Sequence, residues 1–160
     1  MTEQRSPRRQ LLEQNVRTYF EACNEGSHDK MASVFAQTVV HYFPPGMFGP
    51  LVGSRAIADL WRGTIRQNGS RWTIDRMVTD EEENELVVEW THWQPVPGSY
   101  IRGAEWYEFD EEGLITVIKA YYASPRDRTL EANELAGYPY EELGYPMSAP
   151  DEAPQLDDDE

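Results

Sequence analysis

The chain has 160 residues, which suits a single domain with a substantial hydrophobic core. Hydrophobic residues make up 39% and aromatic residues 12%, a globular composition with enough large rings to line a cavity. The 14 basic and 29 acidic residues give a net charge of −15, which argues against binding to nucleic acid or to an anionic membrane surface.

The two ends of the chain are polar. Residues 1–9 are expected to be flexible, and residues 147–160, crowded with Asp and Glu, are predicted to form a disordered acidic tail or, alternatively, an acidic interaction segment. The domain itself spans 10–146, with 126–146 as a C-terminal arm. No apolar run resembles a secretory signal or membrane span, and the lone Cys23 has no disulfide partner, so a cytoplasmic location is expected.

Two helices are predicted first. Apolar residues recur at helical spacing over residues 10–24, where Gly26 ends the helix. Ser27 is a plausible N-cap for the second helix, with Met31, Val34 and Phe35 facing inward.

A strand and a third helix follow. The β-branched and aromatic residues Thr38–Phe43 predict a strand that ends at Pro44, and the stretch through Gly53 is predicted to be loop. Ser54 is expected to cap the third helix, whose inward residues are Ile57, Leu60, Trp61 and Ile65.

After Gly69 the pattern changes to strands. Turn signals separate four strand-like runs, Trp72–Val78, Leu86–Trp93, Ile101–Phe109 and Leu114–Tyr122. Because the turns between them are short, consecutive strands must be antiparallel. The order of elements therefore predicts an α+β fold, with helices packed against one face of a curved sheet.

An ordered set of short stretches carries a family resemblance, among them Tyr19–Gly26, Val39–Gly46 and Glu105–Phe109. In this order they resemble SnoaL-like proteins of the nuclear transport factor 2-like superfamily, a likeness that extends over about Leu11 to Ala123. The resemblance implies a cone-shaped fold in which three N-terminal helices pack on a strongly bent antiparallel sheet. The superfamily includes isomerases, cyclases, dehydratases, epoxide hydrolases and non-catalytic binders, so the resemblance alone fixes no chemistry.

Strand alternation predicts which side chains face an enclosed pocket. Trp90 and His92 should point inward, Glu105 should share the inward face of Tyr107 and Phe109, and Lys119 should point outward. The expected walls of a hydrophobic pocket are large or branched side chains: Phe43, Trp61, Trp90, Tyr107, Ile118 and Tyr122. Such walls imply a substrate with a large, flat, apolar body.

Glu105 is the leading catalytic candidate. An apolar pocket disfavours an ionised carboxylate, so Glu105 could act as a general base or stay protonated and donate to an oxyanion. The alternatives are a Glu that reaches solvent and a Glu that pairs with Arg102 or another basic residue. By resemblance, Glu105 corresponds to the acid of the ketosteroid isomerase oxyanion hole and Tyr19 to its tyrosine. The catalytic aspartate of those isomerases falls on Phe43, which cannot take a proton, so their mechanism is not expected here.

His41 lies two residues before Phe43 on the same strand face and can replace that aspartate as acid or base. The alternative is a buried histidine bonded to the backbone. His92 is a further catalytic candidate on alternation alone. His28 is predicted to lie at the surface, and Cys23 to pack in the core.

The candidate residues, taken with this resemblance, favour a cofactor-independent lyase or isomerase, such as a cyclase or dehydratase. It would transfer a proton next to a carbonyl of a hydrophobic, cyclic small molecule. His41 would move the proton while Glu105 and Tyr19 stabilise the enolate oxygen. No metal-ligand spacing or phosphate loop is present in the sequence. The alternatives are a non-catalytic small-molecule binder or, given the acidic tail, a protein-interaction module. Outward Val87, Trp93 and Val117 predict a homodimer packed sheet to sheet.

Overall fold

The computed structural model describes residues 5–123 and 135–145. The predicted acidic tail, residues 126–134 and 146 of the predicted arm, and residues 1–4 of the N-terminus lie outside these ranges. Within them, no helix is long and apolar enough to cross a membrane.

The three predicted helices are present as α1 (Pro7–Glu25), α2 (His28–Val34) and α3 (Ser54–Asn68). Helix α1 begins three residues before the predicted start, because the Ser6 hydroxyl accepts the backbone N–H of Arg9 at 3.0 Å and Pro7 suits the first turn. Gly26 ends α1 in the left-handed conformation, as predicted.

Two other helix boundaries also differ from the predicted ones. Gly53 is the N-cap of α3, so Ser54 is the first helical residue and makes no capping bond. Phe35 does not end α2 but begins the next strand, where it remains buried. In both cases the true boundary differs by one residue from the predicted one.

The sheet has six strands in the order β2-β1-β6-β5-β4-β3 and is not closed. They are β1 (Phe35–Tyr42), β2 (Leu51–Val52), β3 (Arg71–Asp80), β4 (Glu85–Gln94), β5 (Ser99–Phe109) and β6 (Ile115–Tyr122). Strands β3 to β6 form the predicted antiparallel meander. Strand β1 lies parallel to β6, so the sheet is mixed rather than wholly antiparallel. The short β2, predicted as loop, pairs with β1 through Val40 and His41.

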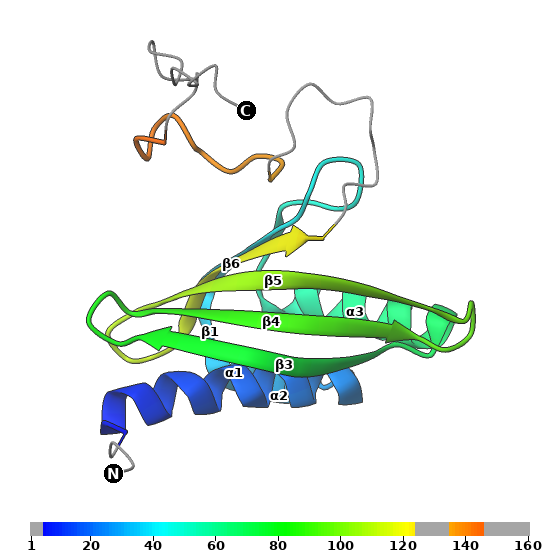
Figure 1. Cartoon of the computed structure of the whole chain (residues 1–160), viewed down its shortest axis with the longest axis horizontal. Helices are drawn as coiled ribbons and strands as arrows, with labels where there is room; N and C mark the ends of the chain where they lie inside the picture. Colours follow the sequence, from blue (N-terminus) through cyan, green and yellow to red (C-terminus); the bar gives the residue numbers. More distant parts are fainter. Residues whose placement is uncertain (1–4, 124–134, 146–160) are drawn as a thin grey trace, which may run out of the picture.

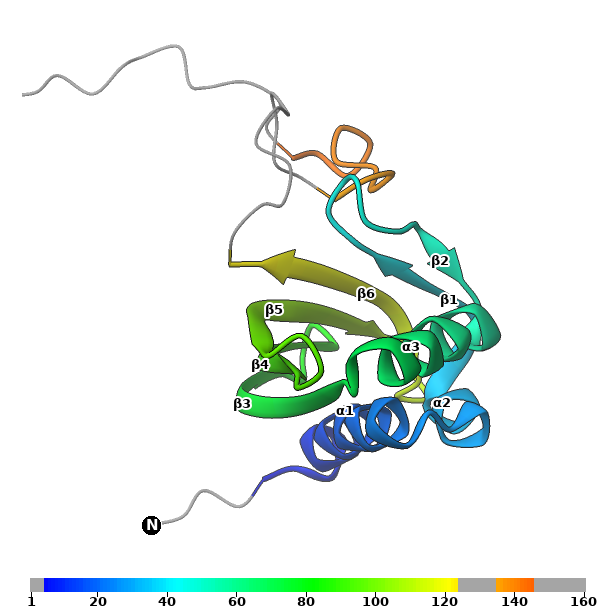
Figure 2. The same ribbon diagram turned by 90° about the vertical axis from the view of Figure 1, so that its right-hand side faces the viewer.

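Figures 1 and 2 show the three helices on one side of the curved sheet. Tyr19 of α1 and Trp61 of α3 lie on that side together, since the Trp61 indole N–H donates to the Tyr19 hydroxyl at 2.9 Å. Strand alternation is also confirmed, because the predicted inward residues Leu86, Val88, Trp90 and His92 of β4 are all buried. The core therefore lies between the helices and the inner face of the sheet.

Two residues of the outer sheet face are buried although alternation predicted solvent exposure. The Thr91 hydroxyl donates to Asp75 at 2.6 Å. Lys119 points outward, forms an ion pair with Glu108 at 3.4 Å and lies against the Tyr138 ring. The described part of the arm, residues 135–145, thus packs on the outer face near β1 and β6.

Candidate functional site

A narrow inner cavity lies between helices α1 and α3 and the inner face of the sheet. The free space at its centre is about 10 Å³, close to the volume that one water molecule requires. Six aromatic side chains form most of its wall: Tyr19, Phe20, Trp61, Trp72, Trp90 and Tyr122. The polar side chains in the lining are those of Glu105, His92 and Cys23.

Glu105 is a buried carboxylate held from two sides. The Tyr107 hydroxyl, two residues along β5, donates to Glu105 Oε2. His41 Nε2 lies 3.5 Å from Glu105 Oε1, close enough for an ion pair when the imidazole is protonated, but without hydrogen-bond geometry. The strand register explains why His41 and Tyr107 both lie near Glu105, because the two residues pair with Ile118 of β6 from opposite sides.

His41 lies behind Glu105 and is fully buried, with no exposed surface. Its ring stacks on Phe43 with centroids 4.0 Å apart. Nδ1 lies 3.3 Å from the Tyr42 carbonyl oxygen, and because a carbonyl can only accept, Nδ1 carries a hydrogen. The remaining nitrogen, Nε2, therefore faces Glu105. His41 is not part of the cavity lining, whereas Glu105 is.

Tyr19 lies beside this pair. Its hydroxyl oxygen accepts the Trp61 indole N–H at 2.9 Å. Burial, with the nearby Glu105 charge as a further cause, raises the pKa of Tyr19 and of Tyr107 well above the usual value of 10. Burial likewise raises the pKa of the Cys23 thiol. All three groups are therefore protonated at neutral pH.

His92 lines the same cavity from β4. Its Nε2 is 2.7 Å from the Ser70 hydroxyl, and its ring stacks on Trp72 at 4.5 Å between centroids. Thus the structure brings His41, Glu105 and Tyr107 into one cluster, with Tyr19 close by. His92 is not part of this cluster, because its contacts in the cavity wall are with Ser70 and Trp72.

Trp90 lines the cavity from β4. Its ring lies over Gly103, its register partner on β5, and meets the Tyr122 ring edge to face at 5.4 Å. A Cβ on Gly103 would come within 2.8 Å of the indole and 2.2 Å of the Tyr121 carbonyl oxygen, so only glycine leaves room for this ring. The Trp90 indole Nε1 is buried and has no hydrogen-bond partner in the described structure.

A larger vestibule of about 210 Å³ adjoins the inner cavity. The two share Trp61, His92 and Tyr122 as lining residues. The vestibule is also bounded by the loop residues Met47 and Phe48. The two hollows are therefore neighbours that border the same three side chains.

The predicted pocket walls separate into two groups. Trp61, Trp90 and Tyr122 line the cavity. Phe43, Tyr107 and Ile118 are fully buried outside both linings, so they support the site from behind. Sequence reasoning missed Phe20, Trp72, Met47 and Phe48 as lining residues. The inward alternation of β3 could have identified Trp72, but the irregular loop holding Met47 and Phe48 gives no periodic signal.

Two other predictions about single residues are confirmed. Cys23 is buried in the core, although it also touches the cavity. His28 lies at the surface, where its Nε2 is 2.7 Å from Asp59. Among the described residues, no group of three or more His, Cys, Asp or Glu side chains is arranged to hold a metal ion.

Residues 16–118 match the family model described as a SnoaL-like domain. Among solved structures, the chain is similar to a protein of unknown function with a cystatin-like fold from Methylobium petroleophilum PM1. The two are 40% identical with a TM-score of 0.85, over 91% of this chain and 97% of the other. No curated protein gives a significant match.

Two more distant structures have the same fold. A candidate ketosteroid isomerase from Kribbella flavida is 14% identical with a TM-score of 0.60, over 74% of this chain and 82% of its own. A candidate polyketide cyclase from Sinorhizobium meliloti is 18% identical with a TM-score of 0.57, over 67% of this chain and 93% of its own. At these identities the likeness concerns the fold.

Proposed function

Because the chain belongs to the SnoaL-like family, we propose that it is a lyase or isomerase of the kind named among its structural neighbours. The proposed reaction is cofactor-independent proton transfer next to a carbonyl group of a hydrophobic, cyclic small molecule. A cyclase, an isomerase and a dehydratase all begin with this step. They differ in what happens to the resulting enolate, which can be reprotonated, close a ring or expel water.

The observation that carries the proposal is the position of Glu105. Its carboxyl lies at a cavity walled by aromatic rings and contacts both Tyr107 and His41. A carboxylate that lines such a cavity is positioned to take a proton from a carbon atom of a bound substrate. The Tyr107 hydrogen bond fixes the orientation of the carboxyl group.

The proposed step conserves charge inside the site. Glu105 removes a proton from the carbon next to the carbonyl, and the electron pair of that C–H bond moves onto the carbonyl oxygen. His41 Nε2, 3.5 Å from Glu105 Oε1, can then accept the proton and return it. Because Glu105 lines the cavity, this proton can exchange with solvent before the enolate is reprotonated.

These roles differ from those expected from the sequence, in which His41 took the substrate proton and Glu105 and Tyr19 held the oxygen. We assign the base to Glu105 because it lines the cavity, while His41 is fully buried behind it. In this proposal Tyr19, whose hydroxyl oxygen accepts from Trp61, takes no part in the proton transfer.

The test requires no knowledge of the natural substrate. Cyclic ketones such as 2-tetralone are incubated with the protein in D₂O, and deuterium uptake next to the carbonyl is followed by mass spectrometry. We expect Glu105→Gln to lower the exchange rate by roughly 10²–10⁴. His41→Phe should lower it as well, because the proton then has no second acceptor.

The matched control is Glu89→Gln, which changes an exposed carboxylate on the outer face of β4 and should leave exchange unchanged. Ketone binding without protein-catalysed exchange would reject the proposed enzyme in favour of a non-catalytic binder. Equal exchange by wild type and Glu105→Gln would show that Glu105 is not the base.

A further inference from the structure

The polar groups around the inner cavity differ in whether they have partners. The Tyr19 hydroxyl and the Trp61 indole N–H bind each other at 2.9 Å. His92 Nε2 is 2.7 Å from the Ser70 hydroxyl. Trp90 also lines the cavity and is only 3% exposed, yet its Nε1 has no partner among the described residues.

An unpaired buried donor requires a physical explanation. A buried N–H without a partner loses its hydration and gains nothing in return, and such groups are rare in folded proteins. Because Trp90 borders a cavity, its partner can come from outside the chain. An indole N–H only donates, so that partner must be a hydrogen-bond acceptor.

The surroundings restrict the acceptor further. The Glu105 carboxyl lines the same cavity, so a negatively charged ligand group would be repelled whenever Glu105 is ionised. The free space of about 10 Å³ admits an oxygen atom but not a ring. The adjoining vestibule of about 210 Å³ has room for the rest of the ligand. Apolar side chains such as Phe48 and Ile101 line it together with the polar side chains of Thr64, Gln67, Asn68 and Gln94.

We infer that the Trp90 indole N–H donates to the carbonyl oxygen of the ligand, which enters the inner cavity oxygen first and leaves its apolar body in the vestibule. This inference rests on the proposed function, because it concerns how the same site holds its substrate. Trp90 would then stabilise the negative charge that develops on that oxygen when Glu105 removes the neighbouring proton.

The experiment compares two probes of nearly the same shape. One is 2-acetylnaphthalene, a ketone, and the other is 2-isopropenylnaphthalene, in which a CH₂ group replaces the oxygen. In ¹⁵N-labelled protein the five Trp residues give five indole N–H signals, and the signal missing from Trp90→Phe identifies Trp90. We expect the ketone to move the Trp90 proton signal downfield and the hydrocarbon to leave it without that downfield shift.

Affinity gives a second measurement. Trp90→Phe keeps an aromatic ring but removes the donor, so the preference for ketone over hydrocarbon should fall by roughly 2- to 10-fold. Trp93→Phe, which changes an exposed tryptophan on the outer face of the same strand, is the matched control and should keep the preference. Retained dispersion of the backbone signals verifies that each variant is folded.

The inference would be overturned if the Trp90 signal stayed in place while the ketone was added up to its solubility limit. Equal shifts with both probes would also overturn it, because they would indicate only displaced water or contact with the rings. Deuterium exchange separates the two proposals. Exchange that depends on Glu105 without a Trp90 response leaves the proposed function standing and removes this inference. A ketone-specific Trp90 response without exchange retains the oxygen site and removes the catalytic function.

Discussion

Gly103 shows how one missing side chain shapes the candidate site. Its position opposite Trp90 on β5 lets the indole lie flat across the sheet, next to Tyr122. We predict that Gly103→Ala pushes the Trp90 ring aside and lowers the free energy of unfolding by about 1–3 kcal/mol, since an added methyl group must displace a packed ring or a backbone carbonyl. Urea unfolding measures the change.

Gly63→Ala is the matched control, because Gly63 is exposed within α3 and a Cβ there meets no atom within 4 Å. This variant should be more stable than wild type by about 0.5–1 kcal/mol, the usual gain from alanine in a helix. If Gly103→Ala were equally stable, the close contact with Trp90 would be wrong.

The two buried tyrosines next to Glu105 predict a loss of stability in alkali. Burial raises the pKa of Tyr19 and Tyr107 above 10, so the unfolded chain releases these protons at lower pH than the folded one. The stabilisation is fully present below about pH 10 and is lost as the pH rises from there towards the folded values. Each tyrosine should lower the free energy of unfolding by up to about 1.4 kcal/mol per pH unit in that range.

Urea unfolding across this alkaline range provides the measurement. Tyr107→Phe removes one of the two groups, so its stability should fall less steeply with pH than that of wild type. An unchanged slope would contradict the assignment of a buried, protonated hydroxyl to Tyr107.

At the scale of single residues, alternation located much of the site in advance. It placed Glu105, His41, Trp90 and His92 on inward faces, because period two is a local property of a strand. It could not show that Tyr19 is engaged by Trp61 or that the Trp90 N–H is unpaired. Those facts depend on how α1, α3 and the sheet meet in space, which no local pattern records.

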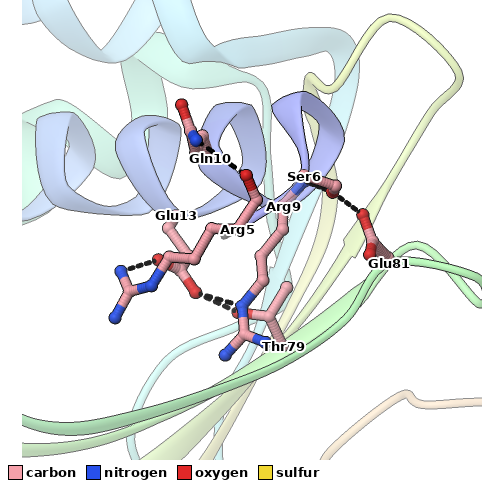
Figure 3. A network of polar contacts seen from close by, with 7 residues as sticks. All are labelled: Arg5, Ser6, Arg9, Gln10, Glu13, Thr79 and Glu81. Carbon is pink, nitrogen blue, oxygen red and sulfur yellow. Dashed lines mark hydrogen bonds and ion pairs between the residues drawn. The ribbon is translucent and has the colours of Figure 1, made fainter. Parts of the chain in front are cut away.

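The first turn of α1 is anchored to β3 by a charge network centred on Glu13 (Figure 3). The buried Glu13 carboxylate accepts hydrogen bonds from Arg5 at 2.6 Å, Arg9 at 2.9 Å and Thr79 of β3 at 3.1 Å, and Ser6 donates to Glu81 nearby. Burial alone would raise the pKa of Glu13, but the hydrogen bonds from Arg9 and Thr79 and the two arginine charges outweigh it and lower the pKa. The network makes the ionised form the stable one.

We predict that Glu13→Gln lowers the free energy of unfolding at neutral pH by about 1–3 kcal/mol, because hydrogen bonds to a charged group are lost. Since the folded pKa lies below the usual 4.5, this stabilisation is present above about pH 4.5 and is lost as the pH falls through the folded value. The difference in free energy of unfolding between wild type and variant should therefore disappear in acid, as measured by urea unfolding.

Glu21→Gln, at an exposed position of the same helix, is the control and should change stability by less than about 0.5 kcal/mol. A constant gap between wild type and Glu13→Gln at all pH values would mean that Glu13 acts through shape and not through charge.

At the scale of elements, the limits of prediction also follow from locality. The helices and the antiparallel meander were predicted because amphipathic spacing and short turns are local signals. The parallel pairing of β1 with β6 joins residues about 75 positions apart, such as His41 and Ile118. No short turn connects the two strands, so no local signal predicts the pairing. Strand β2 has only two residues, too few to show a period.

The outer face of the sheet is covered in one part and exposed in another. Residues 135–145 cover the part near β1 and β6, where the Tyr138 ring contacts Tyr42 and Lys119. The part formed by β4 and β5 keeps exposed aromatic rings, including Trp93 at 39% and Tyr100 at 57% exposure. Apolar side chains on an exposed sheet face favour association with another surface.

The last prediction is that two copies of the chain associate through this uncovered part of the sheet. Light scattering at micromolar concentration should give twice the mass of 18.5 kDa, and Trp93→Glu combined with Tyr100→Glu should give the monomer mass. Each copy carries a net charge of −15, so the two repel, and salt that screens this repulsion should strengthen the dimer. A single-chain mass at all salt concentrations would refute the dimer, while dissociation by added salt would point to an ionic interface elsewhere.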